Sequence, residues 1–178
     1  MALQPKNTYD TSKACADMIA RSYAHNYGLP IVVTRCSNVY GPGDPNLSRI
    51  IPNSISKIFQ GYPPELYSDV SVMEREFIFI DDVVDACLGL ALSGDGTNGE
   101  AFNVGGTGAT SVENVVQTIL ELMGSDLHTK IIPREPAFKE IQRQFIDARK
   151  LCYATGWIPL VSLKDGLLTT IEWYKRKF

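Results

Sequence analysis

Histidine and cysteine are scarce in this sequence, and their scarcity excludes several kinds of site. The 178 residues include two histidines, His25 and His128, and four cysteines that lie far apart and form no Cys-x-x-Cys motif. Structural zinc sites are built from clustered cysteine and histidine ligands, and disulfide frameworks belong to small secreted domains. We therefore predict no metal site, and we expect the cysteines to be reduced thiols of a cytoplasmic protein.

Long apolar runs and basic stripes are also missing. No run approaches the roughly 20 apolar residues of a membrane-spanning helix, and no secretory signal opens the chain. The net charge is −3, with 17 basic and 20 acidic residues scattered along the sequence, and no basic stretch is interleaved with aromatic residues. We therefore predict neither a membrane nor a nucleic acid as partner. With 44% hydrophobic residues, the chain is long enough for one unit, residues 1–178, with its own core.

The pattern that is present alternates helices with short apolar strands. A helix from Tyr9 to about Tyr27 is predicted to end at Gly28, and the β-branched run Ile31 to Cys36 is typical of a buried parallel strand. Ser37 to Pro45 is then expected to be a loop at the carboxyl end of that strand, where open α/β sheets bind ligands. The sequence thus predicts an α/β fold.

The rest of the chain continues this alternation. Gly61 to Val72 is predicted to be irregular, and Gly105 to Gly108 lacks the Gly-x-Gly-x-x-Gly spacing of a dinucleotide loop. The further predicted elements are helices at Ser48 to Gln60, Val83 to Leu92, Ser111 to Met123 and Ser162 to Lys177, a short helix ending at Thr155, and strands at Arg75 to Ile80, Ala101 to Val104, Thr129 to Pro133 and Gln144 to Ile146.

Four of these helices carry capping signals at their starts. Asp81 is predicted to cap the helix that follows it, and Asp147 the short helix ending at Thr155. Thr110-x-x-Glu113 and Ser162-x-x-Asp165 have the spacing of capping boxes. Each signal places a polar side chain beside backbone N–H groups that the first helical turn leaves without a partner.

Tyr9 and Lys13 are four residues apart, so they share one face of the first predicted helix. A phenol is a poor base at neutral pH, but a cation held beside it favours the phenolate. The pair is therefore suited to general acid–base chemistry. The alternative is that both side chains merely decorate a solvated helix face.

Five stretches support the catalytic interpretation: YDTSKACAD, GLPIVVTRCSNVYGPGD, REFIFIDDVVDA, EAFNVGG and TGWIP. In order and spacing they resemble the second half of extended short-chain dehydrogenase/reductases that act on nucleotide sugars. The similarity is greatest to CDP-glucose 4,6-dehydratases, with epimerases and other 4,6-dehydratases nearby. The resemblance implies the C-terminal part of an extended Rossmann-type fold, with NAD as cofactor and a CDP-, UDP- or dTDP-hexose as substrate.

The resemblance also implies roles for individual residues. Tyr9 would remove the proton of the sugar 4-hydroxyl while NAD accepts a hydride, and Lys13 would hold the nicotinamide ribose. In a dehydratase the new keto group then allows water to leave, and the hydride returns to the sugar.

Five further residues match substrate-binding positions of the family. Asn38 would contact the substrate, the alternative being that it only forms a turn. Arg75 would pair with the nucleotide diphosphate, since a guanidinium fork suits that role, or would pair with a neighbouring glutamate instead. Arg49 and Asn103 match positions near the substrate. Arg143 matches a late arginine that closes over the diphosphate, although the neighbouring Gln could occupy that slot.

The family's dinucleotide-binding half would precede Tyr9, where this sequence has only eight residues. We therefore expect a truncated enzyme that is inactive alone, because most contacts to NAD would lie in that half. Two alternatives remain. One is a binding module, whose partner is a nucleotide sugar or a separate chain that supplies the N-terminal half. The other is a structural remnant. In the family, some faces of this part pack on the dinucleotide-binding half. Without that half they would be exposed, so we expect them to pack on a second copy and form a homo-oligomer.

Overall fold

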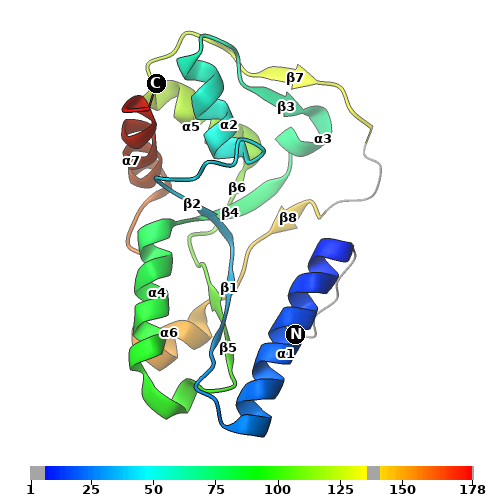
Figure 1. Ribbon diagram of the computed structural model, residues 1–178. Coiled ribbons are helices and arrows are strands. Elements are labelled where there is room, and N and C mark those ends of the chain that lie inside the picture. The colour runs from blue at the N-terminus through cyan, green and yellow to red at the C-terminus, as the bar shows by residue number, and fades with distance from the viewer. Residues whose placement is uncertain (1–6, 136–140, 178) are drawn as a thin grey trace.

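The structure is a computed structural model that describes residues 7–135 and 141–177 (Figure 1). Helices and strands alternate along the chain as expected for an α/β protein. In chain order the elements are α1 (Thr8–Tyr27), β1 (Val33–Cys36), β2 (Asn38–Tyr40), α2 (Ile50–Phe59), β3 (Glu65–Tyr67), α3 (Ser68–Ser71), β4 (Glu74–Phe79), α4 (Ile80–Leu92), the 3₁₀ turn η1 (Gly94–Thr97), β5 (Ala101–Val104), β6 (Ala109–Ser111), α5 (Val112–Leu122), β7 (Lys130–Ile132), β8 (Arg143–Gln144), α6 (Arg149–Thr155) and α7 (Leu163–Lys175).

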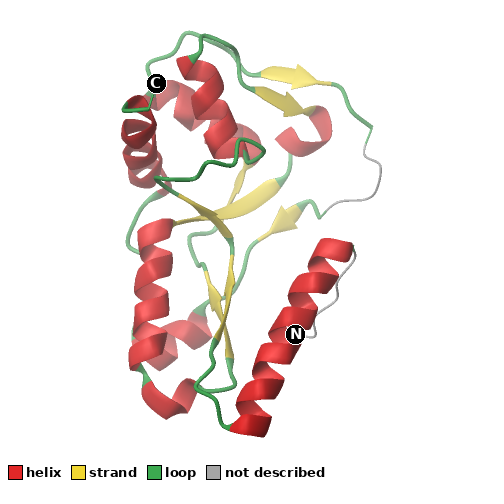
Figure 2. Cartoon of the chain, in the orientation of Figure 1, coloured by secondary structure: helices red, strands yellow, loops and turns green. Residues whose placement is uncertain are grey.

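Most strand pairs are parallel, as the alternation of strands and helices requires. β1 pairs with β5, β2 with β4 and β3 with β7, each in parallel (Figure 2). β4 also pairs with β6, antiparallel, and with the two-residue strand β8, parallel. β4 therefore connects more strands than any other strand of the described residues.

Two hydrophobic cores divide the molecule into a lower and an upper region (Figure 1). In the lower region β1 and β5 lie between α1 on one side and α4 with α6 on the other. That core includes Ile78, Val104 and Leu151, each fully buried. In the upper region α2, α5 and α7 pack together around residues such as Ile55 and Leu167. We call these the lower lobe and the upper lobe.

The predicted elements are largely present, with several differences, among them strand β6, which was not predicted, and β8, which begins one residue earlier than predicted. The first helix ends at Gly28, which adopts φ +65°, as predicted. Part of the loop predicted at Ser37 to Pro45 is instead strand β2, and part of the irregular stretch Gly61 to Val72 forms β3 and α3. These strands are three residues long, too short for a two-residue period to be visible in sequence.

Two of the capping predictions are wrong. α4 already begins at Ile80, and the residue before it makes no side-chain cap, so Asp81 does not cap the helix. Asp82 is the buried acid instead, and its carboxylate accepts the N–H groups of Leu160 and Val161 at 2.9 and 3.1 Å. The cap of α5 is Ser111 rather than Thr110.

Of the other two capping predictions, the one at Ser162 agrees with the structure and the one at Asp147 is displaced by one residue. Ser162 accepts the N–H of Asp165 at 3.1 Å and begins α7. Asp147 accepts the N–H of Arg149, the first residue of α6, at 2.9 Å, although it stands one position before the cap. Over the described ranges, no helix is long and apolar enough to cross a membrane.

Candidate active site

The first turn of α1 presents Tyr9 and Lys13 to solvent. Asn7 caps the helix, because its side-chain oxygen accepts the N–H of Asp10 at 2.8 Å. Tyr9 is 68% exposed, and the Lys13 ammonium lies 5.6 Å from the centre of its ring. The predicted pair is therefore formed, with the cation within range of the aromatic ring.

A bidentate ion pair attaches α1 to β1. Asp17 is buried on α1, and its two carboxylate oxygens accept hydrogen bonds from Arg35 on β1 at 2.7 and 3.0 Å. The hydrogen bonds to Asp17 raise the pKa of the Arg35 guanidinium. Because Arg35 precedes β2 by three residues, this pair sets α1, and with it Tyr9, against the strands that bear the pocket.

Replacing Asp17 with alanine is expected to lower the free energy of unfolding by about 2 kcal/mol, because a half-buried guanidinium loses both acceptors. Urea denaturation of the chain measures this change. Asp10→Ala, on the exposed side of the same helix, is the matched control. Equal stability of Asp17→Ala and the unsubstituted chain would contradict the inferred role of the pair.

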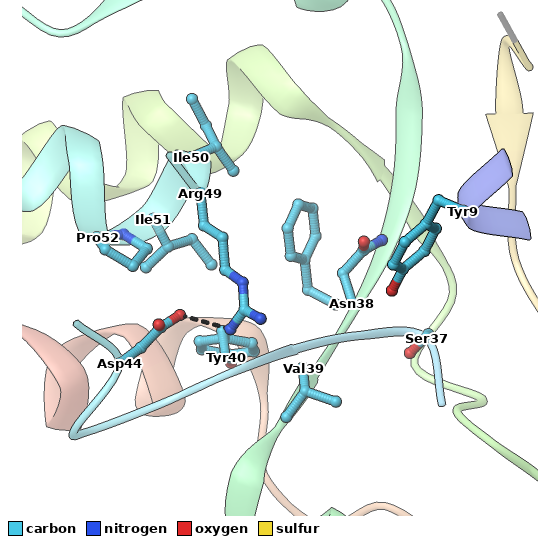
Figure 3. A pocket seen from close by; sticks show the side chains of 11 residues that line it. Tyr9, Ser37, Asn38, Val39, Tyr40, Asp44, Arg49, Ile50, Ile51 and Pro52 are labelled. Carbon is cyan, nitrogen blue, oxygen red and sulfur yellow. Dashed lines mark hydrogen bonds and ion pairs between the residues drawn. The ribbon is translucent and has the colours of Figure 1, made fainter. Parts of the chain in front are cut away.

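A pocket of about 420 Å³ opens between the start of α1, β2 and the start of α2 (Figure 3). Tyr9 and Asn38 lie at one end of it, and Arg49 and Asp44 at the other. The residues that line it are Tyr9, Ser37, Asn38, Val39, Tyr40, Asp44, Arg49, Ile50, Ile51, Pro52 and Phe77. The pocket thus gathers three of the residues predicted from sequence: Tyr9, Asn38 and Arg49.

Asn38 is fixed within the pocket by the neighbouring strand. Its side-chain N–H donates to the backbone oxygen of Glu76 at 2.9 Å, which links β2 to β4. The amide oxygen of the side chain then remains available to a ligand. Asn38 belongs to a strand, so the alternative prediction of a simple turn residue is wrong.

Arg49 is oriented by a chain of contacts that begins at the C-terminal helix. The Tyr174 hydroxyl of α7 donates to the backbone oxygen of Asp44, and the Asp44 carboxylate accepts a hydrogen bond from Arg49 at 3.0 Å. One nitrogen of the guanidinium is thereby used, and the group projects into the pocket (Figure 3). Such a fork is suited to a phosphate or carboxylate.

Tyr40 is the second tyrosine of the pocket, and its environment differs from that of Tyr9. It is buried, and its hydroxyl donates to the Leu163 backbone oxygen at 3.3 Å. Burial, with further contributions from the charges of Asp82 and Asp165, raises its pKa well above the ordinary phenol value. Tyr40 is therefore neutral at physiological pH, which leaves Tyr9 as the pocket's candidate for proton transfer.

Arg75 and Arg143 lie outside the lining of this pocket, on adjacent strands. Arg75 shares a face of β4 with Phe77, which does line the pocket, because alternate strand residues point the same way. Its guanidinium donates to the Glu74 backbone oxygen at 2.9 Å. On β8, Arg143 pairs with the Glu74 carboxylate at 2.7 Å and faces the Phe145 ring. Arg143 is in register with Glu74, and Gln144 with Arg75, so the two arginines project to opposite faces of the sheet.

Asn103 is the predicted residue farthest from this arrangement. It lies on β5 and donates to the Asp147 backbone oxygen at 2.9 Å, and it lines two other surface depressions beside α6. The structure thus assigns Asn103 a contact between β5 and the start of α6. Among residues 7–135 and 141–177 no cluster of potential metal ligands occurs.

A Tyr-Lys helix that leads into parallel strands, with a polar pocket at their carboxyl ends, is the arrangement of a Rossmann-type α/β fold of the short-chain dehydrogenase class. Comparison of the sequence agrees with this class: the profile of the NAD dependent epimerase/dehydratase family matches residues 1–105. The chain therefore belongs to the NAD-dependent epimerase/dehydratase family.

Three relatives that match this chain are named as nucleotide-sugar dehydratases or epimerases. The dTDP-glucose 4,6-dehydratase of Xanthomonas campestris is 34% identical over 180 residues, which cover 96% of this chain and 50% of that enzyme. Among solved structures, dTDP-glucose 4,6-dehydratase from Bacillus anthracis in complex with NAD has a TM-score of 0.86 at 31% identity, covering 98% of this chain and 54% of that one. UDP-glucose 4-epimerase from Thermotoga maritima, solved with UDP-glucose, has a TM-score of 0.87 at 27% identity, covering 98% and 55%.

The chain spans about half the length of the curated relatives it matches. The family and the Rossmann-type fold predicted from sequence are thus confirmed. These relatives carry dTDP-glucose or UDP-glucose in their names, so the similarity to CDP-glucose enzymes remains a prediction about the base.

Sequence reasoning missed the contribution of Asp44 and a second pocket. Asp44 belongs to the loop that was predicted to bind a ligand. Its role is visible only in the folded structure, where its carboxylate accepts a hydrogen bond from Arg49. The second pocket, of about 490 Å³, shares Ile50 with the first and includes Tyr67 and Glu65 of β3. It escaped prediction because Gly61 to Val72 appears irregular in sequence.

Proposed function

We propose that this chain forms the catalytic-helix and C-terminal, substrate-binding part of an NAD-dependent nucleotide-sugar 4,6-dehydratase or epimerase. The observation that supports this most directly is the pocket shared by Tyr9, Asn38 and Arg49, with Lys13 beside the Tyr9 ring. A general acid–base and two groups that bind polar ligands thus meet in one cavity.

In this proposal Tyr9 accepts the proton of a sugar hydroxyl. Its exposed position at the mouth of the pocket allows a sugar ring to approach, and the Lys13 ammonium lies beside its ring. Asn38 holds the substrate beside Tyr9 through its free amide oxygen. The chain's own residues therefore supply proton transfer and orientation.

NAD would supply the hydride acceptor for this chemistry. Tyr9 and Lys13 fit a cofactor ribose, since both are exposed on one helix face and offer a hydroxyl and an ammonium group. The glycine-rich stretch after β5 does not fit the cofactor's phosphates, because three of its N–H groups already bind the Glu76 carboxylate. Most NAD contacts must then come from a dinucleotide-binding half, which a separate chain could provide.

The diphosphate of the substrate would lie near Arg49 and Arg75, and Arg143 would have to leave Glu74 to reach it from β8. A phosphate can replace the backbone oxygens that now accept hydrogen bonds from Arg75. The nucleoside would extend into the second pocket beside Tyr67, whose ring centre lies 4.2 Å from the Arg134 guanidinium. Asn103 would act indirectly, by holding β5 against α6.

Calorimetric titration with CDP-glucose, UDP-glucose and dTDP-glucose, each with and without NAD, tests the proposal. Binding of one nucleotide sugar in the absence of NAD is expected and would identify the base. Failure of all three to bind at millimolar concentration would refute substrate binding by this chain. The chain alone is expected to show no turnover, and turnover only after a dinucleotide-binding half is added.

The outward face of α1 favours an alternative to catalysis and ligand binding, in which this chain has a structural role as an oligomer. Besides Tyr9, four large apolar side chains are exposed on this helix: Met18, Ile19, Tyr23 and Tyr27. Ile19, Tyr23 and Tyr27 recur every four residues, so they form one stripe along the helix. An exposed stripe of this kind is typical of a surface that packs against another protein. We therefore include self-association in the proposal.

Light scattering at increasing protein concentration is expected to show dimers or larger assemblies, because burying the α1 stripe removes apolar surface from water. Ile19→Glu should shift the population toward monomer. Leu92→Glu, at an even more exposed apolar position on α4, is the control. A strictly monomeric protein at high concentration would contradict the prediction.

A further inference from the structure

Glu76 is an acidic residue in the interior of the protein. Its side chain stands on the face of β4 opposite Arg75 and Phe77, and the residue is 1% exposed. A buried carboxylate is costly unless hydrogen-bond donors surround it. Glu76 has such donors in backbone N–H groups: Oε1 accepts those of Gly106, Thr107 and Gly108 at 2.5, 2.8 and 3.2 Å.

The glycines of this loop allow it to surround the carboxylate. Gly106 and Gly108 adopt φ +102° and +83°, which disfavour any other residue. At Gly105 an added Cβ would lie 2.6 Å from the Ile146 side chain and 2.9 Å from Glu76 Oε2. The glycine-rich sequence therefore serves an internal anion instead of a bound phosphate.

The other oxygen of Glu76 holds a second segment. Oε2 accepts the N–H of Ile146 at 2.9 Å. Ile146 follows β8, the two-residue strand that carries Arg143, and precedes α6. The loop 105–108 likewise runs from β5 in the lower lobe to β6 in the upper lobe. One carboxylate thus binds two connections that pass between the lobes (Figure 1).

β8 has few other attachments to β4. Two residues are in register, Arg143 opposite Glu74 and Gln144 opposite Arg75, and the Glu74 N–H donates to Gln142 at 2.8 Å. The bond from Ile146 to Glu76 extends this short attachment by two residues. The position of segment 143–146, with Arg143 in it, therefore depends on Glu76 as well as on the ion pair between Arg143 and Glu74.

We propose that Glu76 is a positioning residue for ligand binding: its carboxylate fixes segment 143–146 on β4 and so sets where Arg143 stands at the edge of the sheet. The part that concerns ligand affinity rests on the proposed function, in which Arg143 approaches the diphosphate of a nucleotide sugar. Glu76 itself touches no ligand, since its side chain is enclosed by backbone on the opposite face of the strand.

Glu76→Gln tests the proposal, because it keeps the shape of the side chain but removes its charge and turns one acceptor into a donor. Hydrogen–deuterium exchange is measured for peptides covering 104–109 and 141–148, with α5 as internal reference. Exchange in both peptides is expected to rise about tenfold, as for loss of a hydrogen bond to a charged group. Glu113→Gln, an exposed acid on α5, is the control. Unchanged exchange in 141–148 would overturn the proposal.

Calorimetry with CDP-, UDP- and dTDP-glucose gives the second measurement. For the one that binds, Glu76→Gln should weaken affinity about tenfold. Adding Arg143→Ala to Glu76→Gln should then cost less than about a further twofold, because both changes remove the same contact. Additive losses, or unchanged affinity despite faster exchange, would overturn the role in positioning Arg143.

If Glu76→Gln is unfolded by circular dichroism, Glu76→Asp replaces it in both measurements. Aspartate keeps the charge but is one methylene shorter, so it should reach only one of the two segments and give a smaller effect of the same sign. If the unsubstituted chain binds none of the three sugars, the proposed function fails, and the affinity part of the inference fails with it. The exchange measurement still decides whether Glu76 holds segment 143–146.

Discussion

Tyr9→Phe is expected to reduce turnover about 10³-fold when the chain is complemented with a dinucleotide-binding half, within the range that general acid–base catalysis contributes. Phenylalanine preserves the ring and its packing beside Lys13 but removes the hydroxyl to which we assign proton exchange with the sugar in the proposed function. Because Tyr9 is largely exposed, the substitution should leave the free energy of unfolding within about 0.5 kcal/mol. The loss should therefore appear in kcat, with little change in KM.

The measurement follows consumption of the nucleotide sugar at saturating NAD. Tyr153→Phe is the matched control, because Tyr153 is a strongly exposed tyrosine of α6 that does not line the Tyr9 pocket. Lys13→Met should lower both kcat and cofactor affinity, since the ammonium has two proposed tasks. Full activity of Tyr9→Phe would show that the hydroxyl has no part in proton transfer.

The part of the site that could be predicted from sequence is the part set by local geometry. Tyr9 and Lys13 meet because a helix brings residues four apart together, and Asn7 and Gly28 fix the ends of that helix. The stretch Ser37 to Pro45 was correctly placed at the carboxyl end of a strand, although part of it forms β2 instead of a loop, and the pocket opens there. Periodicity and spacing were sufficient for these features.

The remainder depends on contacts between residues far apart in the chain. Glu76 resembles any charged strand residue until the fold brings it against residues 106–108 and Ile146. Asp44 gains its role from Tyr174, 130 positions away. The cap predicted at Asp81 fails for the same reason. The neighbouring Asp82 is the buried acid, because the N–H of the distant Leu160 donates to its carboxylate. No local pattern reports such partners.

Arg49→Ala is expected to weaken nucleotide-sugar affinity between about 10- and 100-fold, since a charge-assisted hydrogen bond inside a pocket is worth about 1.5–3 kcal/mol. The guanidinium projects into the pocket from the start of α2, and Asp44 uses only one of its nitrogens in the hydrogen bond given above. Titration calorimetry with the sugar that the unsubstituted chain binds measures the loss. Arg149→Ala, an exposed arginine paired with Asp147 away from this pocket, is the control.

Arg49→Lys separates charge from geometry at the same position. A lysine retains the positive charge but not the planar fork, so it cannot donate to Asp44 and a phosphate in the same arrangement. If Asp44 orients Arg49 for a phosphate, Arg49→Lys should recover only part of the lost affinity, and Asp44→Asn should weaken binding as well. Full recovery by lysine would mean that the site senses charge alone. Unchanged affinity in Arg49→Ala would move the diphosphate toward Arg75 and Arg143, where Glu76 then becomes the residue that orders the binding surface.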